Sequence, residues 1–312
     1  MKIYWGLNNK VSGEYSVAIG VFDGIHLGHQ KIIKKAIQKA GKLKIKSGIV
    51  TFNPHPQKVI SGRNESLILL PLEDKIRYFH NLGIDSLFFI DFNEPFSNLT
   101  PEQFIQHLFE FIDLKSISVG FNFHFGYKGE GNVKDLAKFG EEFQFEVNIL
   151  PPVKYEEQII SSTLIRDLVR KGEVSFASEM LGHLYFISGD VVKGHGRGSK
   201  LGFSTANISP DNEVIPKDGV YATLIEIDKS VYPSITNIGI CPTFKNEGHS
   251  IEVNILDYKK NIYDKWVKIF FIKRLRAEKK FESPEALTAQ IKADTKESGE
   301  IFKKKHKPLE LR

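Results

Sequence analysis

The first half of the chain alternates short apolar runs with amphipathic stretches. The apolar runs predict strands at 16–21, 47–52, 86–91, 116–120 and 145–150. Apolar positions at helical spacing between them predict helices over 30–40 and 101–112, the second capped by Thr100 with Pro101 at its first position. Alternation of strands and helices is typical of a parallel sheet covered on both faces, whose ligands bind at the carboxyl ends of the strands.

The pattern changes after Pro151 and Pro152. A helical stretch over 162–181 is interpreted as a bridge, and strand-like runs follow at 185–192, 220–227, 234–238, 251–256 and 267–272, separated by turn residues rather than helices. They predict a small antiparallel β-barrel with an amphipathic helix over 284–303 on its outside. We therefore expect an α/β parallel-sheet, Rossmann-like domain at 1–155, a helical linker at 156–182 and a β-barrel domain at 183–312.

Composition narrows the class of protein. A length of 312 residues favours two domains, and no apolar run approaches the roughly 20 residues of a membrane span. Without the apolar block of a secretory signal near the start, we expect a cytoplasmic protein with no membrane partner. The single cysteine, Cys241, excludes an intrachain disulfide. The net charge of +5 is spread along the chain, so we expect no nucleic-acid partner; the sequence leaves the oligomeric state open.

The stretch GVFDGIHLGH, at 20–29, follows the first predicted strand and begins a helix. Amide groups at a helix start lack internal partners and favour anions, so phosphate is the expected ligand. Gly24 and Gly28 permit close approach of the backbone, and His26 and His29 donate to phosphoryl oxygens. A metal site or a satisfied polar turn is the alternative, and metal is the poorer one because a third ligand is missing nearby.

Two further motifs of the first half carry similar chemistry. In TFNPHPQKVI, at 51–60, Asn53 and His55 follow the second strand and are expected beside the first turn; the alternative is that Asn53 and its neighbouring prolines merely end the strand. In SSTLIRDLVRKGEV, at 161–174, we expect Ser162 to cap a helix, with Thr163 at its start and Arg166 one turn later. Hydroxyls, amides and a guanidinium together suit a triphosphate.

In the second half, KGHGRGSKLGFSTANI at 193–208 is rich in glycine and cations but lacks the ending of a Walker loop. Taken alone, the loop favours a plain hairpin connection over a phosphate-binding role. Thr205 and Asn207 alternate along an extended segment and so offer two hard oxygens to Mg²⁺ from one side. Glu252 lies between Ile251 and Val253, and a carboxylate projecting into a small barrel must be paired, hydrated or catalytic.

Together these motifs resemble one family. VFDGIHLGH is similar to the nucleotidyltransferase signature of the prokaryotic bifunctional riboflavin kinase/FMN adenylyltransferase family, the FAD synthetases. The stretches LGFSTANI, GVYAT, NIGICPTF, IEVNILD and LRAEKKF follow in the order of the family's kinase module. The resemblance implies a nucleotidyltransferase domain followed by a riboflavin kinase barrel. It also implies an enzyme that phosphorylates riboflavin to FMN and adenylylates FMN to FAD with release of pyrophosphate, with riboflavin, FMN, FAD and ATP as ligands and Mg²⁺ as cofactor.

The resemblance also assigns roles to residues. For adenylyl transfer, with His26 and His29 catalytic, it implies an ATP site made of Phe22, Asp23, Gly24, His26, His29, Asn53, Ser162, Thr163 and Arg166. For the kinase it implies an ATP site made of Lys193, Gly194, Gly196, Arg197, Gly198, Thr205 and Asn207, the last two holding the metal. Glu252 becomes the general base, with a salt bridge as the competing account. Arg276, Glu278 and Asn122 would bind flavin, although surface charge also explains the first two.

Several positions depart from the family pattern. Asn122 and His124 stand where Asp and Arg are usual, and Asn132 replaces another Asp. Exchanging Arg for His replaces a fixed charge by one that titrates. Ser204 replaces a proline and Cys241 an arginine. Two alternatives follow: a riboflavin kinase with weakened or lost adenylyltransferase activity, and a nucleotide- or flavin-sensing protein without turnover, which the retention of Thr205, Asn207 and Glu252 disfavours.

Overall fold

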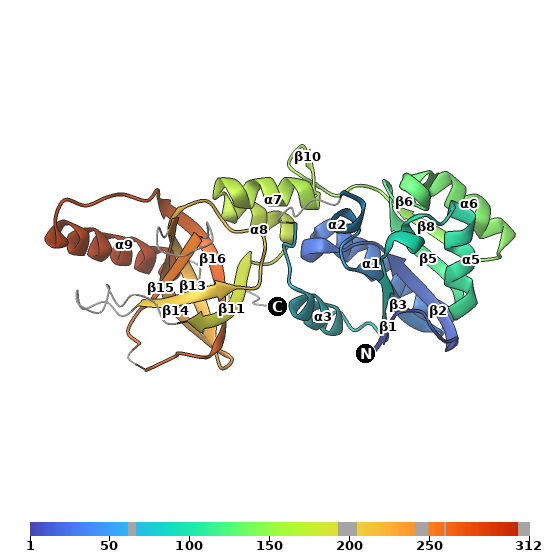
Figure 1. Ribbon diagram of the computed structural model, residues 1–312, viewed down its shortest axis with the longest axis horizontal. Coiled ribbons are helices and arrows are strands. Elements are labelled where there is room, and N and C mark those ends of the chain that lie inside the picture. Colours follow the sequence, from blue (N-terminus) through green and yellow to red (C-terminus); the bar gives the residue numbers. More distant parts are fainter. Residues whose placement is uncertain (62–66, 193–204, 241–248, 259, 305–312) are drawn as a thin grey trace. The chain divides into compact units, whose positions relative to one another are not determined.

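The computed structural model describes residues 1–61, 67–192, 205–240, 249–258 and 260–304 (Figure 1). The chain divides into two compact units. The first comprises Met1–Ser66 and Leu72–Ser161, and the second Leu67–Pro71 and Ser162–Arg312. Among the helices in these ranges, none combines the length and the apolar character that crossing a membrane requires.

The first unit contains the predicted parallel sheet. Its strands lie in the order β1-β4-β3-β2-β5-β8, and every pairing is parallel. The strands are β1 (Lys2–Trp5), β2 (Val11–Ile19), β3 (Lys46–Asn53), β4 (Ser86–Asp91), β5 (Ile112–Gly120) and β8 (Glu146–Leu150). The chain proceeds from β2 outward to β3 and β4, and then returns to the other side of β2 with β5. This reversal at β2 is the topological switch point, where sheets of this kind bind ligands.

Helices and short elements complete the first unit. They are η1 (Asp23–Ile25), α1 (Leu27–Leu43), α2 (Pro56–Ser61), α3 (Leu72–Asn81), α4 (Glu94–Ser97), α5 (Pro101–Phe111), η2 (Tyr127–Gly129) and α6 (Val133–Glu142), with the strand pairs β6 (His124–Phe125) with β7 (Gly131–Asn132) and β9 (Lys154–Tyr155) with β10 (Gln158–Ile159). The predicted cap is confirmed, because the Thr100 hydroxyl accepts from the Gln103 amide at 3.2 Å.

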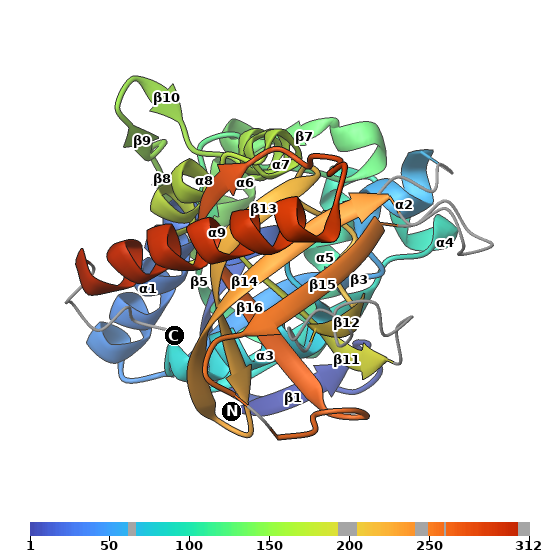
Figure 2. The same cartoon turned by 90° about the vertical axis from the view of Figure 1, so that its left-hand side faces the viewer.

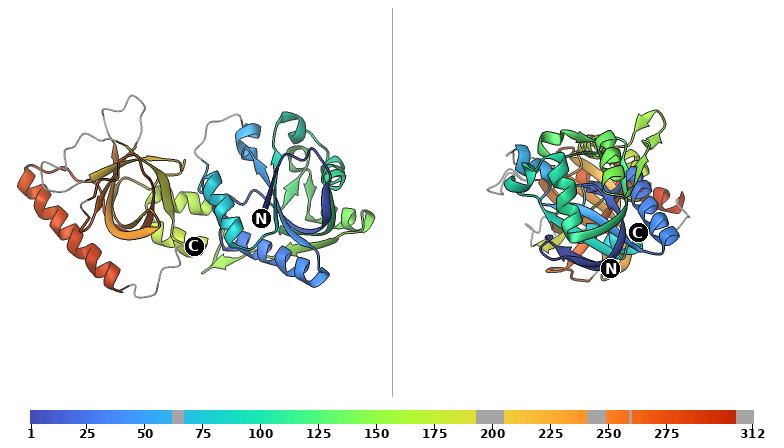
Figure 3. Two further views of the ribbon diagram at one scale, coloured as in Figure 1. Left: turned by 90° about the horizontal axis from the view of Figure 1, so that it is seen from below. Right: turned by 90° about the vertical axis from the view of Figure 1, so that its right-hand side faces the viewer.

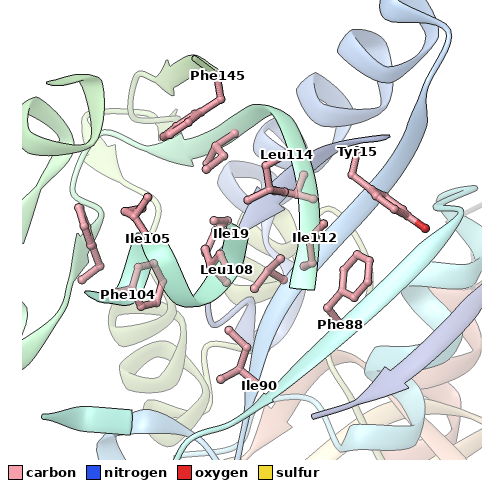
Figure 4. Packing of buried hydrophobic residues seen from close by; sticks show 14 of the residues in the cluster. Tyr15, Ile19, Phe88, Ile90, Phe104, Ile105, Leu108, Ile112, Leu114 and Phe145 are labelled. Atoms are coloured by element: carbon pink, nitrogen blue, oxygen red, sulfur yellow. The ribbon is translucent and has the colours of Figure 1, made fainter. Parts of the chain in front are cut away.

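One hydrophobic cluster of the first unit lies between the sheet and α5 (Figure 4). Phe104, Ile105 and Leu108 of α5 are buried against strand residues that include Ile19 and Phe88. Burial of such side chains is the main stabilising contribution to a domain of this size. It fixes the sheet whose carboxyl edge carries the first motif.

The second unit contains a closed antiparallel barrel with strands in the order β11-β12-β15-β14-β13-β16. The strands are β11 (Phe186–Val192), β12 (Thr205–Pro210), β13 (Gly219–Ile227), β14 (Ser230–Ile240), β15 (His249–Ile255) and β16 (Trp266–Arg276). The helix α9 (Pro284–Lys304) crosses the outside of these strands, as predicted (Figures 2 and 3).

The helical stretch predicted over 162–181 is confirmed, and it is divided in two. The structure has two helices, α7 (Ser162–Lys171) and α8 (Val174–Leu181). Between them Gly172 adopts a φ of +81°, a left-handed conformation that glycine tolerates at little cost. The Gly172 amide donates to the Val169 carbonyl at 2.9 Å, which ends the first helix. The lysine-glycine pair at 171–172 is a helix stop that hydrophobic spacing alone did not reveal.

A short segment ahead of α3 belongs to the second unit. Leu67–Pro71 is tied to it through backbone groups: the amides of Leu67 and Ile68 both donate to the Glu213 carboxylate, at 2.9 and 3.0 Å. The Asn212 side chain donates to the Leu69 carbonyl at 3.0 Å. The sequence pattern did not predict this pairing, since it joins segments far apart in the chain.

Candidate active sites

The turn after β2 has an unusual backbone. Phe22 and Ile25 have φ values of +52° and +41°, which residues other than glycine rarely adopt. The φ of the intervening Gly24 is +76°. Phe22, Asp23 and Ile25 are all buried. The turn therefore places the start of α1 at the carboxyl edge of the sheet, the place that the sequence predicted for an anion.

His26 and His29 stack on each other at the start of α1. Their ring centroids are 3.5 Å apart, and His26 is 6% exposed. His26 is the N-cap: its Nδ1 accepts from the His29 backbone amide at 3.3 Å. A Cβ at position 28 would lie 3.1 Å from the His26 ring, so glycine leaves room for it. Because Nδ1 is an acceptor, the neutral imidazole carries its proton on Nε2, which is thereby a donor.

The other predicted residues of the first unit come to the same edge. Asn53 ends β3, two residues after Thr51, whose hydroxyl donates to the Val21 carbonyl at 3.1 Å. Asn122 follows β5, and its Oδ1 lies 3.3 Å from the position of a Cβ on Gly120. Both side chains are exposed. The structure thus collects the carboxyl ends of β2, β3 and β5 at the switch point.

The third motif lies in the second unit. Ser162 and Thr163 are the first residues of α7, and Arg166 is 6% exposed. The Arg166 Nε donates to the Leu67 carbonyl at 2.7 Å. One nitrogen of the guanidinium is thus engaged with the backbone, while its role at a triphosphate stays a prediction, as do those of Ser162 and Thr163.

The prediction that Glu252 projects into the barrel is wrong. Its neighbours Ile251 and Val253 are 1% and 0% exposed and fill the interior, which leaves Glu252 on the outer face. On that face Glu252 is paired across the strands with Asn207 on β12 and with Asn237 on β14. Thr205 of β12 and Asn254 of β15 form the next pair on the same face. The barrel therefore carries a row of polar side chains on its outside.

This polar row opens on a cavity of about 350 Å³. One wall of the cavity is polar and contains Thr205, Asn237, Glu252 and Asn254; the other includes Phe281 and the α9 residues Leu287 and Ile291. An apolar wall with a few convergent polar groups is typical of a small-molecule site. The cavity lies entirely within the second unit.

Arg276 and Glu278 line the same cavity. Arg276 makes a paired contact with Asp294 of α9: its Nε lies 3.1 Å from both carboxylate oxygens, and its Nη2 lies 2.8 Å from Oδ2. Asp294 is 4% exposed, and Gln290 also donates to it, at 2.9 Å. Arg276 is thus a partly buried residue that joins α9 to β16, and the surface-charge account does not hold for it.

Comparison with known proteins matches each half of the chain to a family. A family model described as FAD synthetase matches residues 8–164, and one described as riboflavin kinase matches residues 181–302. The bifunctional riboflavin kinase/FMN adenylyltransferase of Listeria monocytogenes is 38% identical over 96% of this chain and 95% of its own. The chain belongs to this family. The protein of the same name from Bacillus subtilis is also 38% identical, over 92% of each chain.

A solved structure extends the likeness to three dimensions. A crystal structure named as a macrolide-efflux protein from Streptococcus pneumoniae superposes with a TM-score of 0.89 at 32% sequence identity. It covers 96% of this chain and 99% of its own. The architecture described above is therefore shared over nearly the full length of both proteins.

Part of the predicted kinase site of this family member lies outside the described residues. This applies to Lys193, Gly194, Gly196, Arg197 and Gly198, and to two departures from the family pattern, Ser204 and Cys241. Thr205 and Asn207 are described. They alternate with the buried Ala206 and Ile208, so they face the same side of β12, as predicted.

Two other residues that depart from the family pattern make local contacts. Asn132 is the N-cap of α6: its Oδ1 accepts from the Lys134 amide at 2.9 Å, and its Nδ2 donates to Asp135 at 2.6 Å. Asparagine is among the best N-caps, so it serves this helix well. His124 is exposed, and its Nδ1 lies 3.1 Å from the Gly129 carbonyl.

We expect Asn132→Ala to weaken the start of α6. Loss of the side-chain acceptor should lower the local unfolding free energy by about 1 kcal/mol. Hydrogen exchange of the first-turn amides of α6 measures this change. Asn132→Ser keeps an acceptor and should exchange at nearly the wild-type rate; equal protection in all three proteins would contradict the capping role.

Proposed function

We propose that this chain makes FAD from riboflavin in two steps, with the barrel transferring the γ-phosphoryl group of ATP to riboflavin and the parallel-sheet unit transferring AMP from ATP to FMN. Matches to both family models, and to full-length relatives named for both activities, support this over a kinase alone. The observation that carries the kinase step is the placement of Glu252 in a polar row beside a cavity of about 350 Å³.

In the kinase, Glu252 is the general base. Its carboxylate takes the proton of the ribityl 5′-hydroxyl as that oxygen attacks the γ-phosphorus and ADP leaves. Asn207 and Asn237 lie across the strands on either side of it. Their amides orient the carboxylate and the substrate hydroxyls, and the apolar wall with Phe281 and Leu287 accepts the flavin ring.

Magnesium fits the outer face of the barrel. Thr205 and Asn207 offer a hydroxyl and an amide oxygen from one side of β12, the hard donors that Mg²⁺ prefers together with phosphates. When bound there, the ion would neutralise charge on the triphosphate. ATP is a substrate in both steps. We include no nucleic-acid or membrane partner.

In adenylyl transfer, an oxygen of the FMN phosphate attacks the α-phosphorus of ATP and pyrophosphate leaves, so no enzyme nucleophile is needed. His26 donates from Nε2 to an oxygen of the α-phosphate, because its Nδ1 accepts from the His29 amide. The amides of the α1 N-terminus add positive potential. We assign nucleotide contacts also to Asn53, Ser162, Thr163 and Arg166, and a flavin contact to Asn122.

The test is a single incubation. Purified protein is mixed with riboflavin, ATP and Mg²⁺, and FMN and FAD are followed separately by chromatography. We expect FMN to appear first and FAD after it, and FAD to form from supplied FMN. A kinase alone would accumulate FMN with no FAD, and a binding protein would yield neither.

A further inference from the structure

The helix α3 lies behind the first turn of the adenylyltransferase unit and contacts it at the carboxyl end of β2. The Lys75 ammonium donates to the Val21 carbonyl at 2.5 Å and to the Thr51 hydroxyl at 3.1 Å. Thr51 in turn donates to the same carbonyl at 3.1 Å. The last carbonyl before the turn is therefore held by two donors, one from α3 and one from β3.

A second contact from α3 reaches the other end of the turn. The Gln30 side chain donates to the Ile25 carbonyl and to the Tyr78 hydroxyl, both at 3.0 Å. The ring of Phe79 meets Phe22 edge to face at 6.1 Å. Lys75, Tyr78 and Phe79 thus form a backing for the whole stretch from Val21 to Ile25.

The turn needs such support. Its left-handed residues, Phe22 and Ile25, hold a conformation that costs of order 1–3 kcal/mol each and persists only where the surroundings fix it. The same stretch leads directly into His26, the cap of α1. A shift of Val21 or Ile25 would therefore move the imidazole that faces the nucleotide.

Lys75 is an unusual choice for structural support alone. It is 8% exposed, and burial lowers the pKa of its ammonium to about 8, while the charge of Asp23 acts in the opposite direction. A buried charge is expensive to keep, and apolar residues often stabilise such a position as well or better. The retained cation lies directly beneath a turn whose expected ligand is a polyphosphate.

We propose that Lys75 is a positioning residue for adenylyl transfer: its ammonium holds the Val21 carbonyl, and so sets the turn that places His26 and the α1 amides against the nucleotide. This inference rests on the proposed function. The ammonium form is the stronger donor to this carbonyl, so the turn is held most firmly when Lys75 is charged. Among the described residues, the charged group that acts on it is Asp23 on η1; on α3 itself, the adjacent Asp74 has Arg77 3.9 Å away.

The experiment compares Lys75→Met, Lys75→Arg and the control Lys42→Met, which removes an exposed cation from the last turn of α1. FAD formation from FMN and riboflavin phosphorylation are measured on each preparation from pH 6 to 10. Lys75→Met should lower kcat/KM for FAD formation by ~10- to 100-fold, as misplacement of reacting groups does, with the kinase rate unchanged. Lys42→Met should leave both activities unchanged.

The pH profile separates positioning from mere support. Wild-type FAD formation should fall as the pH rises through about 8, where Lys75 loses its proton. Lys75→Arg should retain FAD formation and lose this alkaline limb, since arginine stays charged. If Lys75→Met does not fold, the Lys75→Arg variant alone tests the inference. An alkaline fall in FAD formation that is the same as in the wild-type protein would contradict it.

The two proposals fail in different ways. Wild-type protein that makes no FAD from FMN would contradict the proposed function. Wild-type protein that makes FAD, together with a Lys75→Met variant of equal rate and equal pH profile, would overturn the role of Lys75 alone. A Lys75→Met variant in which both activities fall together indicates general loss of folded protein, and the pH profile of Lys75→Arg then decides.

Discussion

Glu252→Gln should abolish FMN formation while FAD formation from supplied FMN continues. The substitution keeps the size of the side chain and its place opposite Asn207 and Asn237 on the outer face. It removes the only feature that a general base needs, an oxygen able to take the proton of the ribityl hydroxyl. Loss of a positioned base costs roughly 10²- to 10⁴-fold in rate. The measurement is the initial rate of FMN formation under saturating riboflavin and ATP.

Glu226→Gln provides the matched control. Glu226 is a partly exposed glutamate on β13, and it does not line the cavity. Its substitution makes the same change of charge on the same barrel, so it should leave both activities at the wild-type level. A Glu252→Gln variant that phosphorylates riboflavin at the full rate would remove Glu252 from the mechanism and favour a structural role for it.

Hydrophobic spacing predicted the parallel sheet and most of the barrel because these elements bury one face or both. The run at 86–91 coincides with β4, whose interior residues are buried. The edge strand β1 was not predicted, since Ile3 and Trp5 are 38% and 54% exposed and the segment lacks alternation. The sequence pattern predicted β12 only as an extended segment. Its polar residues, Thr205 and Asn207, lie on the cavity side and interrupt the apolar run.

The candidate sites were predictable where a motif fixes the backbone and not where contacts join distant segments. His26 and His29 follow from the strand-turn-helix pattern, but the cap that sets the tautomer of His26 is visible only in the structure. The predicted orientation of Glu252 was wrong, because alternation along a strand shows which residues share a face and does not show which face is inside the barrel. Asp294 and Lys75 were missed, because each acts through a partner at least 18 residues away in the chain.

His26→Asn should nearly abolish FAD formation and leave both the fold and riboflavin phosphorylation intact. Asparagine is a strong N-cap, so its side-chain oxygen can replace Nδ1 as the acceptor for the start of α1. The asparagine side chain is shorter than that of histidine, so it has no donor at the position of Nε2. Removing one donor that acts on charge developing in a transition state costs about 10²- to 10³-fold. Single-turnover formation of FAD from FMN measures the loss.

His26→Ala separates the two roles of this residue. It should lose catalysis to the same extent and, in addition, about 1 kcal/mol of local stability at the start of α1, because the capping acceptor is gone. Hydrogen exchange of the first-turn amides of α1 reports that second loss, which His26→Asn should not show. If His26→Asn retained the wild-type rate, the donor at this turn would have to come from the backbone amides, and His26 would be a cap only.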